Sequence, residues 1–156
     1  MAKHTIRFTV NGIDRTVETE SNKTLLWVLR RKLGLTGTKS ACERGDCSLC
    51  TVLLDDKPVK SCLVLAVEAN GHKLTTIEGI SKDGVLSNVQ KKIVEHGALQ
   101  CGFCTPAAVL AAEALLKRNP SPTRDDVVEA IEGILCRCTG YRQIVDAIID
   151  ASKMKP

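Results

Sequence analysis

Aromatic residues are scarce in this chain of 156 residues, since two Phe, one Trp and one Tyr make up only 3% of it. Proteins that bind single-stranded nucleic acid stack bases on aromatic side chains, and this composition disfavours that class of function. The formal net charge of +4 is spread along the chain and is too small to indicate a DNA surface. The sequence therefore predicts no nucleic-acid partner.

Long apolar runs are also missing. No stretch approaches the roughly 18 apolar residues that a membrane-spanning helix needs, so no membrane span is expected. The first residues, Met1–Arg7, lack the apolar segment of a signal peptide and contain no twin-arginine pair. These features predict a cytoplasmic protein.

Cysteine, in contrast, is abundant, with eight residues in the chain. Disulfides are rare in a reducing cytosol, so dense cysteine in a chain without an export signal points to metal or redox chemistry. The alternative is a disulfide scaffold, which small secreted domains use when their core is insufficient. Apolar residues make up 44% of this chain, which is enough for a core, and this alternative is therefore disfavoured.

The first half of the sequence predicts strands. Residues 5–10 alternate between apolar and polar, and Asn11-Gly12 is a hairpin signal that returns the chain over 15–19. Residues 24–33 switch to helical spacing. Further strands are expected at 51–54, 62–67 and 73–77.

From about residue 79 the pattern changes. A polar segment that contains glycine connects to a second half in which helical spacing continues to the end. Four short helices are expected, around 86–93, 105–117, 123–134 and 141–152. The sequence thus predicts an α+β protein in which a small strand-rich domain precedes a helical one.

The cysteines fall into two sets of four. The first set, Cys42-x4-Cys47-x2-Cys50-x11-Cys62, has the plant-type [2Fe–2S] spacing, with three ligands on one loop and the fourth further along the chain. Gly45 and Ser48 are small enough for this loop to wrap a cluster tightly. The alternative is a structural zinc site, which usually shows two separated C-x2-4-C pairs, a pattern absent here.

The second set is Cys101-x2-Cys104-x31-Cys136-x1-Cys138. Two of these residues precede one expected helix and two follow another, so they can meet where helix ends come together. A turn at residues 136–138 would bring both sulfurs of the last pair to one cluster. From spacing alone, a zinc site remains open at this position.

The motifs around the second set resemble a known family. The segments Cys101-Gly102-Phe103-Cys104-Thr105-Pro106 and Leu135-Cys136-Arg137-Cys138-Thr139-Gly140-Tyr141 are similar to the iron–sulfur part of the molybdenum hydroxylases, which include xanthine dehydrogenases, aldehyde oxidoreductases and aerobic carbon monoxide dehydrogenases. Residues 33–39 resemble the same family. The resemblance implies a plant-type, ferredoxin-like β-grasp domain at 1–78, a linker at 79–85 and a [2Fe–2S]-binding four-helix bundle at 86–156.

The resemblance also implies roles for individual residues. All eight cysteines would be metal ligands of two [2Fe–2S] clusters, and Gln100 and Cys138 would lie against the pterin of a molybdenum cofactor. Many family members have Gly directly after the second loop cysteine, whereas this chain has Ser48. That departure leaves the ligands intact but affects the hydrogen bonds of the loop to sulfur.

The function that the resemblance implies is electron transfer within an oxidoreductase. The chain would be the small subunit beside a large molybdenum-cofactor subunit and a medium FAD subunit, as a heterotrimer or its dimer, and would relay electrons from molybdenum to FAD or another acceptor. It shows no nucleophile–base pair and no phosphate-binding loop, so no catalytic residue is expected on it. The alternative is a free-standing two-cluster ferredoxin.

Overall fold

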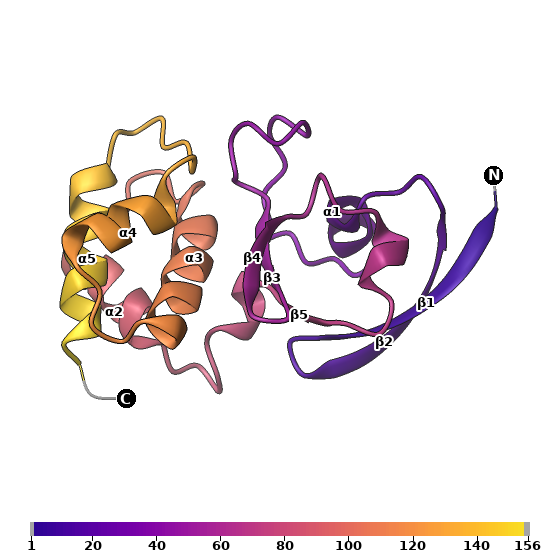
Figure 1. The fold of residues 1–156 in the computed structure, drawn as a ribbon, viewed down its shortest axis with the longest axis horizontal. Coiled ribbons are helices and arrows are strands. Elements are labelled where there is room, and N and C mark those ends of the chain that lie inside the picture. The colour runs from indigo at the N-terminus through magenta and orange to yellow at the C-terminus, as the bar shows by residue number, and fades with distance from the viewer. Residues whose placement is uncertain (1, 155–156) are drawn as a thin grey trace.

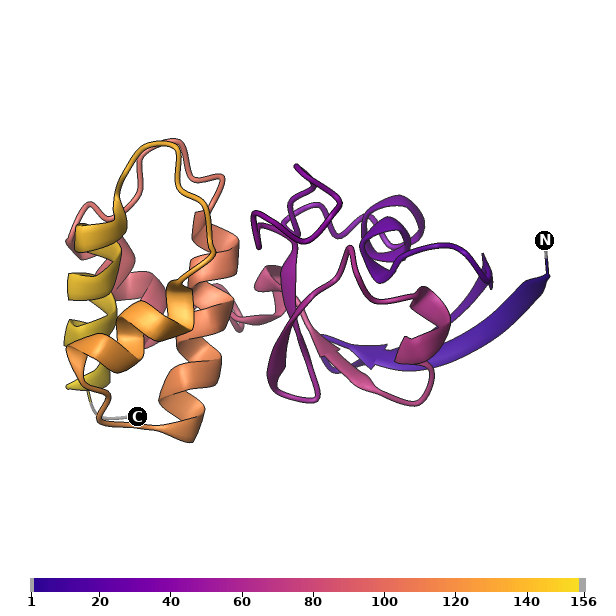
Figure 2. The ribbon, with the colours of Figure 1, turned by 45° about the horizontal axis from the view of Figure 1, so that its top comes forward.

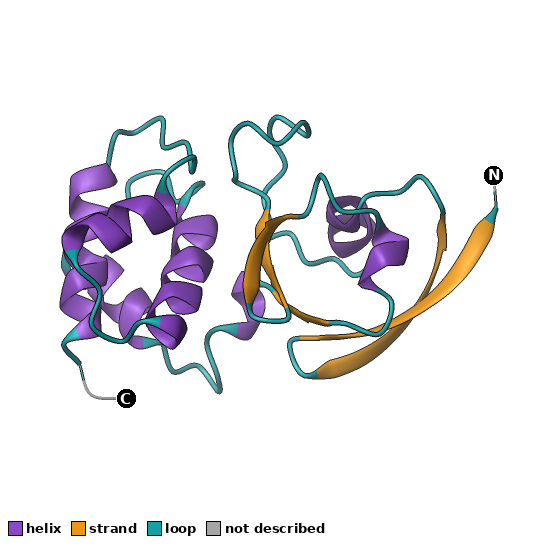
Figure 3. Ribbon diagram, viewed as in Figure 1, coloured by secondary structure: helices purple, strands orange, loops and turns teal. Residues whose placement is uncertain are grey.

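The computed structural model describes residues 2–154 and has two halves side by side (Figures 1 and 3). A five-stranded sheet forms the N-terminal half, and the helices that follow residue 87 form the C-terminal half. The predicted α+β class, with strands before helices, is confirmed. Within residues 2–154, no helix is long and apolar enough to cross a membrane.

The sheet has the strand order β2-β1-β5-β3-β4. Strands β1 (Lys3–Val10) and β2 (Ile13–Glu20) pair antiparallel through the predicted hairpin. Its turn residues Asn11 and Gly12 have φ of 53° and 80°, as a two-residue hairpin turn requires. Strand β5 (Lys73–Thr75) lies in the middle of the sheet, parallel to β1 and antiparallel to β3 (Thr51–Leu54).

One helical segment covers the sheet. It begins as α1 (Leu25–Trp27), capped by the Thr24 hydroxyl, and continues as a π-helix over Val28–Lys32, so the helix predicted at 24–33 is confirmed. Its apolar side chains are buried against alternate residues of β1, which explains the period-2 pattern of that strand. The core of this half consists of Ile6, Phe8, Val10, Val17, Leu25, Val28, Leu29, Val52, Ala66, Ala69 and Leu74.

The strand expected at 62–67 is wrong. The backbone of this segment instead bonds to the helix, through Leu25 N–H to Val64 C=O at 2.8 Å, and continues as a 3₁₀ turn over Ala66–Ala69. An apolar run without alternation is compatible with several backbone conformations. The edge strand that pairs with β3 on the side opposite β5 is β4 (Lys57–Lys60), which the sequence did not indicate because it contains Pro58 and two lysines. Proline and lysine are typical of an exposed sheet edge.

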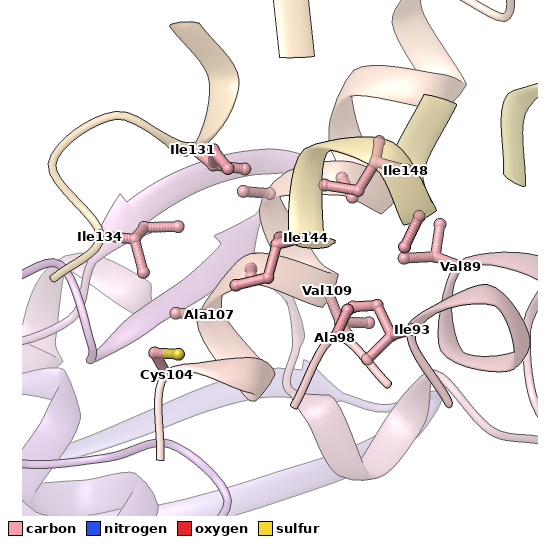
Figure 4. Packing of buried hydrophobic residues seen from close by; sticks show 14 of the residues in the cluster. Val89, Ile93, Ala98, Cys104, Ala107, Val109, Ile131, Ile134, Ile144 and Ile148 are labelled. Atoms are coloured by element: carbon pink, nitrogen blue, oxygen red, sulfur yellow. The ribbon is translucent and has the colours of Figure 1, made fainter. Parts of the chain in front are cut away.

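The four predicted C-terminal helices are present as α2 (Asn88–Glu95), α3 (Thr105–Arg118), α4 (Arg124–Ile131) and α5 (Tyr141–Ser152). Capping boxes begin α2 at Ser87 and α4 at Thr123, and the latter uses Asp126, as expected. Figure 4 shows the inward side chains of this half, with Val89 and Ile93 of α2 near Ile148 of α5, and Cys104 at the margin of the packing.

The two halves share a small apolar contact. Leu53 of β3 packs against Leu110 and Ala114 of α3, with Ile77 and Ile80 of the connecting segment against them. Leu110 is only 1% exposed, although it lies on the side of α3 that faces away from the helical core. The sheet and the helices therefore hold each other in a fixed orientation.

We expect Leu110→Ala to lower the free energy of unfolding by about 2–5 kcal/mol, because truncation of the side chain leaves a cavity at the contact between the halves. Denaturant unfolding followed by far-UV circular dichroism measures the change. A matched substitution at an exposed position of α4, Val128→Ala, should cost less than about 1 kcal/mol. Equal losses for the two variants would contradict a packed contact at Leu110.

Candidate metal centres

The cysteine-bearing loops lie on the same side of the molecule, at the top of each half in Figure 1. Loop 42–50 extends from the end of the sheet, and the loops before α3 and before α5 extend from the helices on the same side (Figures 1 and 2). None of the eight cysteines is in a disulfide. The disulfide-scaffold alternative therefore finds no support in the structure.

The first set of thiols is arranged in two pairs. The thiol of Cys42 has that of Cys47 as its neighbour, and the thiol of Cys62 has that of Cys50. The fourth cysteine reaches the others because the turn after β4 returns the chain to the loop, with Ser61 N–H bonded to Cys50 C=O at 3.2 Å. Leu26 of α1 packs against Cys50 and Cys62 and shields them.

Backbone N–H groups of the loop point at these sulfurs. Hydrogen bonds from the N–H of Arg44 first, and then of Cys47, lower the pKa of Cys42 to about 6. Burial raises the pKa of the Cys62 thiol to about 11, while the N–H of Gly45 partly opposes it. A metal-bound cysteine is a thiolate, so the loop already provides dipoles that stabilise the charge the ligand must carry.

The second set shows the same pairing. The thiol of Cys101 has that of Cys138 as its neighbour, and the thiol of Cys104 has that of Cys136, so residues more than thirty positions apart in the sequence are brought together. The N–H of Phe103 lowers the pKa of Cys101. Burial raises that of Cys104 to about 12. Burial also works to raise the pKa of Cys136, but the N–H of Gly140, the thiol of Cys104 and the N–H of Cys138 together outweigh burial, and the net pKa is lowered.

This arrangement fits a [2Fe–2S] cluster at each set. Such a cluster contains two irons, each of which needs two thiolates, and both sites present two pairs of thiols. The buried hydroxyl oxygen of Thr105, directly after Cys104, has no hydrogen-bond partner among residues 2–154.

Gln100 directly precedes Cys101 and lies beside the second set. Its side-chain N–H₂ donates to the backbone C=O of Cys138 at 3.3 Å. The histidines lie elsewhere: His72 bonds to Asp55 and His96 to Asp150. Neither histidine takes part in a cysteine set.

The two sets are also connected to each other, which sequence reasoning did not find. Leu135 N–H donates to the C=O of Cys47 at 3.1 Å, so the residue before Cys136 is bonded to a cysteine of the first set. Lys39, just before the first loop, lies over the Phe103 ring at 5.9 Å. These contacts join segments about ninety and sixty residues apart, and no local spacing could have indicated them.

The fold and the paired thiols define a class: a two-cluster electron-transfer protein, with a ferredoxin-like half and a helical half. Comparison with known families agrees. Residues 8–75 match the "2Fe-2S iron-sulfur cluster binding domain" family, and residues 76–149 match the "[2Fe-2S] binding domain" family.

Similar proteins narrow the class. The chain is 49% identical to the nicotine 6-hydroxylase small subunit of Paenarthrobacter nicotinovorans, over 91% of this chain and 86% of that protein. It is 45% identical to the nicotinate dehydrogenase small FeS subunit of Eubacterium barkeri, over 95% and 94%. The crystal structure of quinoline 2-oxidoreductase from Pseudomonas putida 86 contains a chain that superimposes with a TM-score of 0.93 at 44% identity, over 97% of this chain and 94% of that one.

This chain belongs to the iron–sulfur small-subunit family of the molybdenum hydroxylases. It is the electron-transfer subunit of an oxidoreductase and carries two [2Fe–2S] clusters. In some relatives the same unit is fused into a longer chain, since the aldehyde oxidoreductase of Megalodesulfovibrio gigas is 44% identical over 92% of this chain but only 16% of its own length. The free-standing ferredoxin alternative is not favoured by these relatives.

Ser48 adopts the backbone conformation that the family's glycine would suit. Its φ is 52°, its side chain is buried, and its C=O accepts the Thr51 hydroxyl at 2.6 Å. In this left-handed region the Cβ of a residue other than glycine clashes with the backbone, which destabilises the conformation by about 1–2 kcal/mol. The loop therefore keeps the required shape at a cost in stability.

We expect Ser48→Gly to stabilise the holoprotein by about 0.5–1 kcal/mol, since glycine removes this penalty but is more flexible when unfolded. Thermal unfolding with intact clusters measures the difference. The control is Ser121→Gly, at an exposed position outside the left-handed region, where glycine should give no stabilisation. A decrease in stability for Ser48→Gly would contradict the analysis.

Proposed function

We propose that all eight cysteines are cluster ligands, in the two sets that the sequence predicted. The first cluster would be held by Cys42, Cys47, Cys50 and Cys62, and the second by Cys101, Cys104, Cys136 and Cys138. The observation that carries this proposal is the arrangement of each set in two thiol pairs. Each bound cluster would supply one-electron transfer, which the thiolates alone cannot perform.

The protein contributes burial and hydrogen bonds. The buried Cys50, Cys62 and Cys104 exclude water from the inner side of each site. The N–H groups directed at Cys42, Cys101 and Cys136 stabilise negative charge on sulfur. These two effects are the means by which a protein sets the reduction potential of a cluster.

The second site lies beside an exposed apolar surface, which we assign to the large molybdenum-cofactor subunit. Large apolar side chains around the site remain partly or mostly exposed in the isolated chain: Leu99, Phe103, Leu135 and Tyr141. Exposed apolar groups that cluster in this way are typical of a protein interface. A stable complex that buries this surface would exceed about 1,000 Å² of contact.

We assign Gln100 and Cys138 to contact with the pterin of that subunit. Gln100 donates to the Cys138 backbone through its side-chain nitrogen, so its amide is held beside the second site while its oxygen remains available as an acceptor. The first site would then face the medium FAD subunit or another acceptor, in a heterotrimer or its dimer. Electrons would pass from the second site to the first.

We also propose domain limits at 1–78 and 86–156, joined by 79–85. The sheet and its core lie within the first range, and α2–α5 lie within the second, where they would form the family's four-helix bundle. Helix α2 contacts α5, and helix α3 contacts α4, which supports that arrangement.

Metal analysis tests the cluster assignment. We expect about four irons and four labile sulfides per chain in freshly isolated complex, and about two of each in Cys47→Ser. The same variant tests the order of electron transfer. In Cys47→Ser, substrate should still reduce the molybdenum centre and the second cluster, but transfer to the acceptor should stop. Stopped-flow absorbance measures both steps.

The matched control is Ser48→Gly, which changes the neighbouring residue and should retain four irons. Stoichiometric zinc in the wild-type chain would contradict the cluster assignment. Undiminished flavin reduction by a Cys47→Ser complex that lacks the first cluster would contradict the order of transfer.

Gln100→Ala tests the pterin assignment. We expect normal iron content, because Gln100 is not a ligand, together with slower reduction of the clusters by substrate or weaker retention of the molybdenum cofactor. Iron and molybdenum analysis with single-turnover kinetics measures all three quantities. A variant that loses iron but keeps the cofactor and normal cluster reduction would show that the assignment is wrong.

A further inference from the structure

Tyr141 makes a direct hydrogen bond to the backbone of a proposed ligand. Its hydroxyl oxygen accepts the N–H of Cys136 at 2.8 Å. Because this N–H bonds to the tyrosine, it is not directed at a cluster sulfur. The bond therefore acts on the position of the ligand and not as one of the N–H···S contacts of the site.

The bond closes a turn that is otherwise strained. Thr139 has a φ of 61°, uncommon for a residue with a branched side chain, and its N–H returns to the C=O of Cys136 at 3.2 Å. Cys136 is thus held at both of its backbone polar groups. Its N–H is fixed by Tyr141 and its C=O by Thr139.

This geometry directs N–H groups of the turn at one sulfur. Those of Gly140 and Cys138 donate to the thiol of Cys136, while the N–H of Thr139 holds the Cys136 C=O. The direction of these N–H groups depends on the position of the turn relative to α5. Tyr141 fixes this position, because it is the first residue of α5, and Ile144 and Ile148 of the same helix are buried in the core.

Hydrogen bonds to sulfur favour the more negative state of a cluster. A [2Fe–2S] cluster gains one negative charge on reduction, so donors aimed at its ligands stabilise the reduced form and raise its potential. Each donor is effective only at short distance and good alignment. A residue that holds the donors in place therefore influences the potential without contacting the cluster.

We propose that Tyr141 is a positioning residue that raises the reduction potential of the second cluster by holding the Cys136–Gly140 turn. The proposal rests on the function above, since it requires a cluster at Cys101, Cys104, Cys136 and Cys138. It assigns to the tyrosine hydroxyl a role in electron transfer that apolar packing of the ring alone would not produce.

The test is Tyr141→Phe in the intact complex, which keeps the ring and removes only the oxygen. Redox titration followed by electron paramagnetic resonance measures each cluster separately. We expect unchanged iron content and a potential of the second cluster that falls, with the equilibrium constant for its reduction lowered about threefold to tenfold, where tenfold corresponds to about 59 mV. The first cluster, in the same molecule, should keep its potential and is the internal reference.

Ser152→Ala is the matched control. It also removes one hydroxyl hydrogen bond from α5, that of Ser152 to the Ile149 C=O at 2.7 Å, but at the far end of the helix. It should leave both potentials unchanged.

A Tyr141→Phe complex with full iron and an unchanged or higher potential of the second cluster would overturn the proposal, and the ligand assignment would remain. So would an equal shift at both clusters, or the same shift in Ser152→Ala. If the wild-type complex shows no second cluster signal at all, the failure lies in the proposed function instead.

Discussion

The requirement that four thiols meet in two pairs governs this structure. A [2Fe–2S] cluster needs two thiolates on each of two irons. In this chain the cysteines lie on irregular loops or at their ends, where Glu43, Gly45, Ser48, Gly102 and Thr139 adopt positive φ. These loops are strained, and their shape persists only because rigid elements hold their ends.

The two apolar cores provide that rigidity. The sheet and α1 hold loop 42–50, while α3 and α5 hold the ends of the second site. Leu53 and Leu110 join the cores, and the bond from Leu135 N–H to Cys47 C=O joins the loops themselves. Both contacts join segments that are far apart in the sequence but close in space. They keep the distance between the two cluster sites fixed, which one-electron transfer between them requires.

The same arrangement is compatible with the two neighbours that we propose for this chain. The partner that we propose for the second site would meet its apolar surface and the Gln100 amide, whereas the first site lies on the other half of the molecule, where Leu26 of α1 packs against Cys50 and Cys62. No substrate machinery is needed on such a chain. Its contribution is distance, burial and the hydrogen bonds that set each potential, and Tyr141 extends that control to the end of a helix.

Local features were determined by the sequence alone. The Asn11-Gly12 hairpin, the Thr123 capping box and the placement of three cysteines on one loop depend on neighbouring residues, so their spacing predicts them. The pairing of Cys104 with Cys136, the position of β5 between β1 and β3, and the bond between Tyr141 and Cys136 N–H were decided by the tertiary structure. Segment 62–67 shows why: its apolar residues fit a strand, but its backbone found hydrogen-bond partners on the helix at Leu25, and only packing could choose between the two.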